Sequence, residues 1–176
     1  FLTLQNGIEN PDTIAQTAAH VVAGTTAHGV TFLGPGEIRH AGVGDTTVGA
    51  WTGVGTPDVI RVRDVLEEAG FPTRTTTDIR TELWAKLAVN AAINPIAALA
   101  GAPNGRLVRD ERLSELLETA CREVAAVANA SGRRMNPEAL VKRARLVARR
   151  TAANRASMLQ DLDRGHRTEL DAITGA

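Results

Sequence analysis

The feature that most constrains this chain is a polar row on an otherwise apolar helical segment, residues 82–95. Lys86, Asn90 and Asn94 recur every four residues, and such positions on an α-helix differ by only about 40° in direction and about 6 Å in height. Leucine, valine, isoleucine, alanine and tryptophan surround them. Amides and an ammonium in such surroundings need hydrogen-bond partners. The row therefore requires polar neighbours, and a bound polar ligand is one candidate.

The lysine of this row is distinctive because the chain uses arginine almost everywhere else. Of its 20 basic residues, only Lys86 and Lys142 are lysine. Arginine keeps its proton near neutral pH, whereas a partly buried lysine has a lowered pKa. A titratable proton donor at this position must therefore be lysine. The spacing also fits a lysine that reaches solvent beside two asparagines that fill polar gaps.

Composition excludes several classes of protein. The 176 residues suffice for one domain or two small ones, and 43% hydrophobic with 3% aromatic residues predicts a core of Leu, Val, Ile and Ala. A net charge of zero gives no indication of a nucleic-acid partner. The single Cys121 excludes an internal disulfide and favours a reducing, cytoplasmic location. The sequence has no run of 18 apolar residues and no visible signal peptide, which argues against a membrane partner.

The first part of the chain has the pattern of an α/β structure. Short apolar runs separated by turn residues predict strands at 1–5, 20–24 and 73–77, and an antiparallel pair between 30 and 50. Helices are expected at 12–19, with Asp12 as N-cap, and at 57–69, between Pro57 and Gly70.

After Asp78, strand signals disappear and helical patterns follow. Asp78 is a candidate N-cap for the helix that carries Lys86, and Pro95 is expected to kink or interrupt it. Further helices are predicted at 111–130, ended by Gly132, at 137 to about 162, and from Thr168 onward. The basic run 142–150 interleaves with Leu and Val, as on a solvated helix face. The chain therefore divides into an α/β part, 1–78, and an all-α part, 79–176.

Other chemical motifs are weak. The glycines at 34–36 and 42–44 do not complete G-x-G-x-x-G and are interpreted as turn glycines. The four histidines show no metal-ligand spacing, so no metal is expected. Ser157 lacks the G-x-S-x-G context of a hydrolase. Taken locally, Asn6, Ser157 and Glu169 fit turn, cap and surface positions.

A series of short motifs follows in a fixed order along the chain. They are Leu4-Gln5-Asn6-Gly7, Gly24-Thr25-Thr26-Ala27-His28-Gly29, Pro35-Gly36 with His40, Glu82 to Asn90 with Asn94-Pro95, Asn104-Gly105, Ser157-Met158-Leu159-Gln160-Asp161 and Thr168-Glu169-Leu170-Asp171-Ala172-Ile173. This ordered set spans nearly the whole chain and resembles the ketopantoate reductase (2-dehydropantoate 2-reductase) family. One departure is Thr174, where the family usually has asparagine before Gly175.

The resemblance implies a fold and a location for the site. That family has an N-terminal Rossmann domain that binds NADPH and a helical C-terminal domain like that of 6-phosphogluconate dehydrogenase, with the active site in the cleft between them. Residues 1–78 are then expected to be the C-terminal portion of the Rossmann-like domain, and residues 79–176 the helical substrate-binding and catalytic domain. The glycine-rich turn and the last helices of the family are expected to lie outside this chain.

The resemblance also implies roles for individual residues. Lys86 matches the general acid and Glu169 the catalytic carboxylate. The substrate-binding positions are matched by Asn90, Asn94, Ser157 and Asn6, and Asn6 and Glu169 also match positions next to the cofactor.

The implied function is reduction of 2-dehydropantoate to pantoate by NADPH, in pantothenate biosynthesis. The implied enzyme is cytoplasmic, acts on a small 2-keto acid, and could be a homodimer. Two alternatives stay open: a reductase of another 2-keto acid in the same family, and a non-catalytic helical module for dimerisation or ligand binding.

We predict that the isolated 176-residue chain binds NADPH poorly and turns over little or nothing. The reason is that the pyrophosphate would lack the helix N-terminus that follows a glycine-rich turn. The measurement is ketopantoate-dependent oxidation of NADPH by the purified chain, and detectable turnover would refute the prediction.

Overall fold

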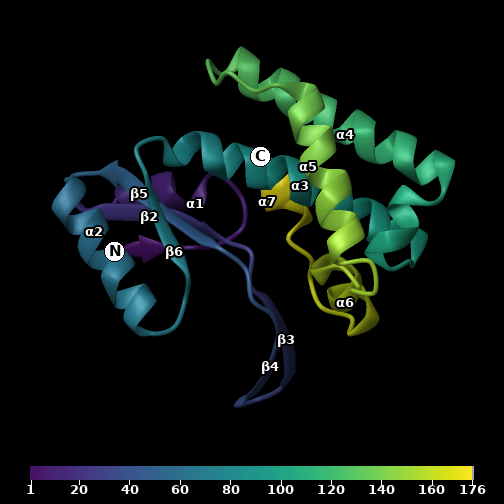
Figure 1. Ribbon diagram of the computed structural model, residues 1–176, viewed down its shortest axis with the longest axis horizontal. Helices are drawn as coiled ribbons and strands as arrows, with labels where there is room; N and C mark the ends of the chain where they lie inside the picture. Colours follow the sequence, from purple (N-terminus) through teal and green to yellow (C-terminus); the bar gives the residue numbers. More distant parts are fainter. Residues whose placement is uncertain (176) are drawn as a thin grey trace. The chain divides into compact units, whose positions relative to one another are not determined.

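The computed structural model describes residues 1–175. Its elements in chain order are β1 (Leu2–Thr3), α1 (Asn10–Ala15), β2 (Val21–Thr26), β3 (Gly29–Gly34), β4 (Glu37–Gly42), β5 (Thr46–Thr52), α2 (Thr56–Glu68), β6 (Thr73–Thr76), α3 (Ile79–Ala100), the 3-10 helix η1 (Asn104–Val108), α4 (Glu111–Ala130), α5 (Pro137–Arg150), α6 (Ser157–Asp163) and α7 (Leu170–Thr174) (Figure 1). An α/β part is thus followed by an all-α part, as the sequence patterns predicted.

The chain forms two compact units. The first, the α/β unit, consists of residues 1–5 and 9–83, and the second, the helical unit, consists of residues 6–8 and 84–175 of the described chain. The short segment Asn6–Ile8 therefore belongs with helices that lie far from it in sequence.

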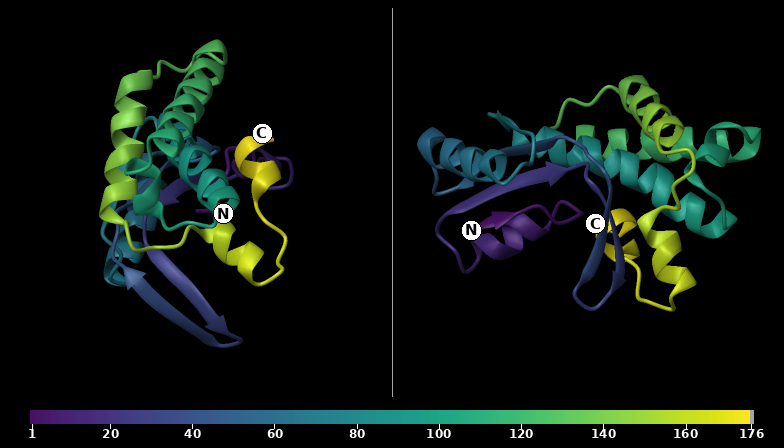
Figure 2. Two further views of the ribbon diagram at one scale, coloured as in Figure 1. Left: turned by 90° about the vertical axis from the view of Figure 1, so that its right-hand side faces the viewer. Right: turned by 60° about the horizontal axis from the view of Figure 1, so that its bottom comes forward.

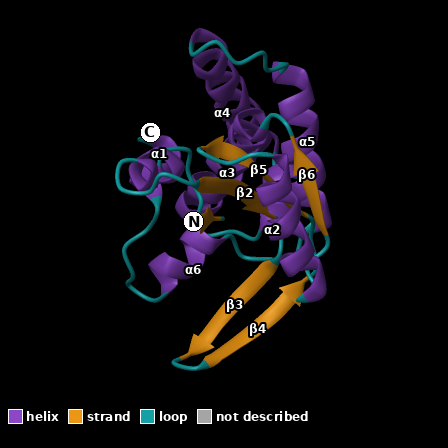
Figure 3. Cartoon of the chain, turned by 90° about the vertical axis from the view of Figure 1, so that its left-hand side faces the viewer, coloured by secondary structure: helices purple, strands orange, loops and turns teal. Residues whose placement is uncertain are grey.

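The α/β unit contains a four-stranded mixed sheet and a separate hairpin. The sheet has the order β1-β2-β5-β6, in which β2 and β5 are antiparallel and the two outer pairs are parallel. Strands β3 and β4 form a two-stranded antiparallel hairpin that extends beyond the sheet (Figure 3). The core beneath helix α2 is built from the valines Val22, Val48 and Val59.

The helical unit is organised around α3. One side of this helix packs against α4 and α5 through small and branched residues, including Ala88, Ala92 and Ile93. Another side, with Leu87 and Ala91, joins a second apolar cluster. Helices α4 and α5 lie side by side (Figure 2). The core is aliphatic, as expected from a composition with few aromatic residues.

By length and composition, α3 could cross a membrane, and among the described residues it is the one helix with this property. More than half of its most apolar window is buried inside the protein. Because the core helix of a soluble protein has the same character, this is weak evidence for a membrane span.

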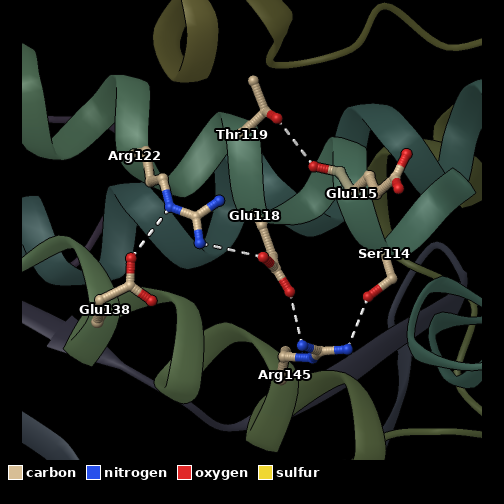
Figure 4. A network of polar contacts seen from close by, with 7 residues as sticks. All are labelled: Ser114, Glu115, Glu118, Thr119, Arg122, Glu138 and Arg145. Carbon is tan, nitrogen blue, oxygen red and sulfur yellow. Dashed lines mark hydrogen bonds and ion pairs between the residues drawn. The ribbon is translucent and has the colours of Figure 1, made fainter. Parts of the chain in front are cut away.

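An ion-pair network joins α4 to α5 (Figure 4). Arg145 donates to the Glu118 carboxylate at 2.6 Å and to the Ser114 hydroxyl at 2.8 Å. Arg122 bridges Glu118 and Glu138, with both N–O distances at 3.1 Å. The basic run 142–150 is thus part of a helix whose remaining arginines and lysine are exposed, as predicted.

Several helix ends are confirmed. The Asp78 carboxylate accepts a hydrogen bond from the Thr81 backbone N–H at 3.1 Å, as an N-cap does. Gly70 and Gly132, which follow α2 and α4, adopt φ values of 85° and 80°. Only glycine takes this left-handed conformation without strain, which explains why the helices end there.

Three predicted features are wrong. Helix α1 begins at Asn10 after Glu9, and Asp12 accepts instead from the Trp51 indole at 2.9 Å. Helix α7 begins at Leu170, so Thr168 is not its N-cap. Pro95, which was expected to kink or interrupt α3, does not interrupt it, because the helix continues through this residue.

The third error is the single helix expected from 137 to about 162, because the chain leaves the helix after Arg150 and re-enters it at Ser157. The Gly105 and Asn104 N–H groups donate to the carbonyls of Ala152 and Asn154, each at 3.0 Å. These long-range hydrogen bonds hold the connecting loop, and no proline or glycine in the loop signals it.

We predict that Leu117→Ala destabilises the protein by about 2–5 kcal/mol, because the removed side chain leaves a cavity in a core where Leu117 is fully buried. Its neighbour Leu116 is 54% exposed and provides the matched control. Urea unfolding monitored by circular dichroism measures both variants. Equal losses for Leu116→Ala and Leu117→Ala would contradict the packing described here.

Candidate active site

The structure contains the polar row that the sequence predicted on α3. Lys86 and Asn90 are partly buried, and Asn94 is only 8% exposed. Their apolar neighbours Leu87, Ala91 and Ile93 are buried in the cores on either side. The row therefore runs along a narrow strip between two packed faces.

Asn6 joins this row from the N-terminal end of the chain. It lies in the turn after β1, within the helical unit. Its side-chain oxygen Oδ1 accepts from Asn90 Nδ2 at 3.2 Å, and its Nδ2 donates to Glu169 Oε2 at 2.8 Å. Residues separated by 84 and 163 positions are thereby connected through one amide.

Lys86 and Glu169 form the charged part of the site. Burial lowers the pKa of the Lys86 ammonium below its ordinary value, and the negative charge of Glu169 opposes this shift. Glu169 is the residue that precedes α7, so the carboxylate sits at the start of that short helix. Lys86 is thus a proton donor that titrates more readily than an ordinary lysine. The negative charge of Glu169 favours the protonated, positively charged form of Lys86.

The other two predicted residues meet one turn further along α3. Asn94 Nδ2 lies 3.4 Å from the hydroxyl oxygen of Ser157, the first residue of α6. The site thus has two hydrogen-bonded groups, one built on Asn90 and one on Asn94, about 6 Å apart along the helix axis. All six residues predicted from the sequence lie in the helical unit.

Sequence reasoning named Asn104 only as part of the Asn104-Gly105 motif and gave it no role of its own. Asn104 is 6% exposed and donates from Nδ2 to the Thr151 hydroxyl at 2.9 Å. Its Oδ1 is buried without a protein hydrogen-bond partner in the described part of the chain. Since buried acceptors are rarely left unpaired, this oxygen is suited to a water molecule or a ligand. The Asn104-Gly105 motif was the signal in the sequence that pointed to this position.

The chemistry of this site is that of proton transfer and neutral hydrogen bonding. Among residues 1–175, no three His, Cys, Asp or Glu side chains are grouped as metal ligands. Amides, a hydroxyl, an ammonium and a carboxylate can bind an organic anion, stabilise negative charge on its oxygen and supply a proton.

Family comparisons match both parts of the chain. Residues 78–176 match the model described as "Ketopantoate reductase PanE/ApbA C terminal", and residues 1–53 match "Ketopantoate reductase PanE/ApbA". The chain belongs to the ketopantoate reductase family. Its α/β unit is accordingly a Rossmann-like portion, and the all-α part is the family's helical domain, which confirms the predicted fold class.

Curated relatives of the chain bear names that agree with this family membership. The 2-dehydropantoate 2-reductase of Halobacterium salinarum is 42% identical over 177 residues, and that of Archaeoglobus fulgidus is 38% identical over 174 residues. Each alignment covers 99% of this chain and 58% of the relative. The chain thus spans less than two thirds of the length of these relatives.

Solved structures show the same fold. A PanE/ApbA family ketopantoate reductase from Ralstonia eutropha superposes with a TM-score of 0.84 at 33% identity, covering 99% of this chain and 57% of that one. A D-mandelate dehydrogenase bound to NADH has a TM-score of 0.93 at 22% identity, with 99% and 60% coverage, which demonstrates similarity of fold alone.

We predict that Glu169→Gln lowers the pKa of Lys86 further, because the carboxylate that favours the charged ammonium is lost. Carbon-13 labelling of lysine and NMR titration of the chain measure this directly. Only Lys86 and Lys142 contribute signals, so Lys142 on α5 is an internal reference. An unchanged Lys86 titration would show that the two groups do not interact.

Proposed function

We propose that the full-length protein containing this chain reduces 2-dehydropantoate to pantoate with NADPH, as a step of pantothenate biosynthesis. The observation that carries the proposal is the connection of Lys86, Asn90, Asn6 and Glu169 in one polar site. Family membership and the names of the curated relatives support the choice of substrate.

In this proposal Lys86 is the general acid. NADPH, when bound, supplies the hydride that the keto carbon receives. The keto oxygen then gains negative charge, which the Lys86 ammonium stabilises before donating its proton to form the hydroxyl. Burial suits Lys86 to this role, because a lowered pKa makes the proton easier to release near neutral pH.

Glu169 and Asn6 have a supporting role on the other side of Lys86. The carboxylate keeps the ammonium charged between turnovers, and Asn6 holds one of its oxygens at 2.8 Å. We also assign both residues to the cofactor. An amide and a carboxylate fit a nicotinamide, whose carboxamide both donates and accepts hydrogen bonds.

We assign Asn90, Asn94 and Ser157, with Asn6, to substrate binding. The substrate is an anion with a hydroxyl group, and amide and hydroxyl donors bind a carboxylate without adding a titrating charge.

The remaining parts of the proposal concern organisation and location. We assign residues 1–78 to the Rossmann-like domain and residues 79–176 to the helical substrate and catalytic domain. A cytoplasmic location is supported by the single, buried Cys121, which fits a reducing compartment. Light scattering of the full-length protein would test for a homodimer.

The substrate is tested by oxidation of NADPH with 2-dehydropantoate beside pyruvate, 2-oxoisovalerate and oxaloacetate. A clear preference for 2-dehydropantoate supports the proposal. Preference for another acid would retain the Lys86 mechanism and change the substrate. A folded protein that binds NADPH and reduces none of the acids would reject the proposed activity.

The general acid is tested by Lys86→Ala in the full-length enzyme, with Lys142→Ala as the matched control. We expect kcat to fall on the order of 100- to 10,000-fold, the usual contribution of general acid catalysis. The Kd for NADPH should change little. In the wild type, kcat should decline as pH rises through the lowered pKa of Lys86, because the ammonium is then lost. Equal loss of kcat and NADPH affinity would contradict this role.

A further inference from the structure

The turn that carries Asn6 is fastened to the helical unit by its next two residues. Gly7 has φ 89°, in the left-handed region, and its backbone lies against α7. A Cβ atom added there would come within 2.8 Å of the Ala172 carbonyl oxygen and 3.4 Å of the Ala172 Cβ. A side chain at position 7 would therefore be strained and would also force the turn and α7 apart.

Ile8 provides the second attachment. It packs on the apolar cluster formed by Leu87 and Ala91 of α3, Met158 of α6 and Ile173 of α7. Leu87 directly follows Lys86, and Ile173 lies one helical turn after Glu169. This one cluster thus contains the residue that follows Lys86 and a residue one helical turn after Glu169, and it contacts Ile8 of the turn that carries Asn6.

The position of the Glu169 carboxylate depends on contacts from outside its own helix. Helix α7 has only five residues, and Glu169 makes no side-chain capping bond to it. Its carboxylate accepts a hydrogen bond from Asn6 Nδ2. Because Asn90 donates to the oxygen of the Asn6 amide, the nitrogen end of that amide is directed at Glu169.

From this geometry we propose that Gly7 and Ile8 are positioning residues for Glu169. They dock the turn on α3 and α7, Asn6 then fixes the carboxylate, and the carboxylate sets the charge state of Lys86. The inference rests on the proposed function for its catalytic meaning, but its structural part does not depend on any substrate.

The test compares Gly7→Ala with Gly132→Ala. Gly132 has nearly the same backbone conformation, φ 80°, lies in the same unit, and has nothing within 4 Å of an added Cβ. Both variants carry the strain of alanine at positive φ, and only Gly7→Ala presses on α7. Circular dichroism verifies that each variant is folded.

The first readout is the NMR titration of Lys86 in the chain, with Lys142 as reference. We expect Gly7→Ala to shift the Lys86 titration to lower pH, in the direction of Glu169→Gln, and Gly132→Ala to leave it in place. A folded Gly7→Ala with the wild-type Lys86 titration would overturn the proposal. If Gly7→Ala does not fold, Ile8→Ala, which adds no backbone strain, decides in the same way.

The second readout is kinetic and uses the full-length enzyme. We expect kcat of Gly7→Ala to fall about 10- to 100-fold, since a displacement of about 1 Å in a catalytic group can have such an effect. The alkaline limb of its pH profile should move to lower pH, and the Kd for NADPH should stay within about twofold. A purely structural role would lower the amount of folded enzyme without moving the pH profile, and this result would overturn the proposal.

The two readouts separate the positioning role from the proposed function. A shifted Lys86 titration in a protein that reduces no keto acid would retain the positioning of Glu169 and reject the reductase assignment. If the wild type is active but neither Gly7→Ala nor Ile8→Ala shifts the Lys86 titration, the reductase assignment is retained and the positioning role is rejected.

Discussion

The need to hydrogen-bond a polar row inside an apolar helix is the constraint on which the helical unit depends. Helix α3 is buried on two sides, and only a strip with Lys86, Asn90 and Asn94 remains for polar contact. An amide in such a place costs free energy unless it is paired. The partners come from distant parts of the chain, Asn6 before the helix and Ser157 after it. The same requirement that stabilises the fold thus gathers the groups that we assign to catalysis.

Local signals in the sequence predicted much of this architecture. The 3.6-residue period located α2, α4 and α5, and side-chain or glycine signals located ends such as Asp78 and Gly132. These features succeed because each depends on residues only three or four positions apart. The resemblance of the ordered motifs then indicated the fold class, which the family comparisons confirm. The roles of the six site residues stay predictions.

The features that sequence reasoning missed depend on contacts between distant segments. The break between α5 and α6 is held by the N–H groups of Asn104 and Gly105, which no local pattern could reveal. Asn104 was noted in the sequence only as part of a family motif, and its burial and its hydrogen bond to Thr151 are visible only in the structure. Asp12 had the local properties of an N-cap, but its carboxylate accepts a hydrogen bond from the Trp51 indole N–H instead. In each case a tertiary hydrogen bond outweighed the local preference.

The helical unit is not a contiguous stretch of the gene. It includes residues 6–8, which precede strands β2, β5 and β6 of the sheet, and the first of these, Asn6, belongs to its polar site. Splitting the chain anywhere between residues 9 and 83 would produce a C-terminal piece that retains Lys86 and Glu169 but has lost the amide between Asn90 and Glu169. If recombination exchanged the two units between proteins as separate gene segments, the site would therefore be left incomplete. Recombination within this family is expected to preserve residues 6–8 and the helices as one inherited set.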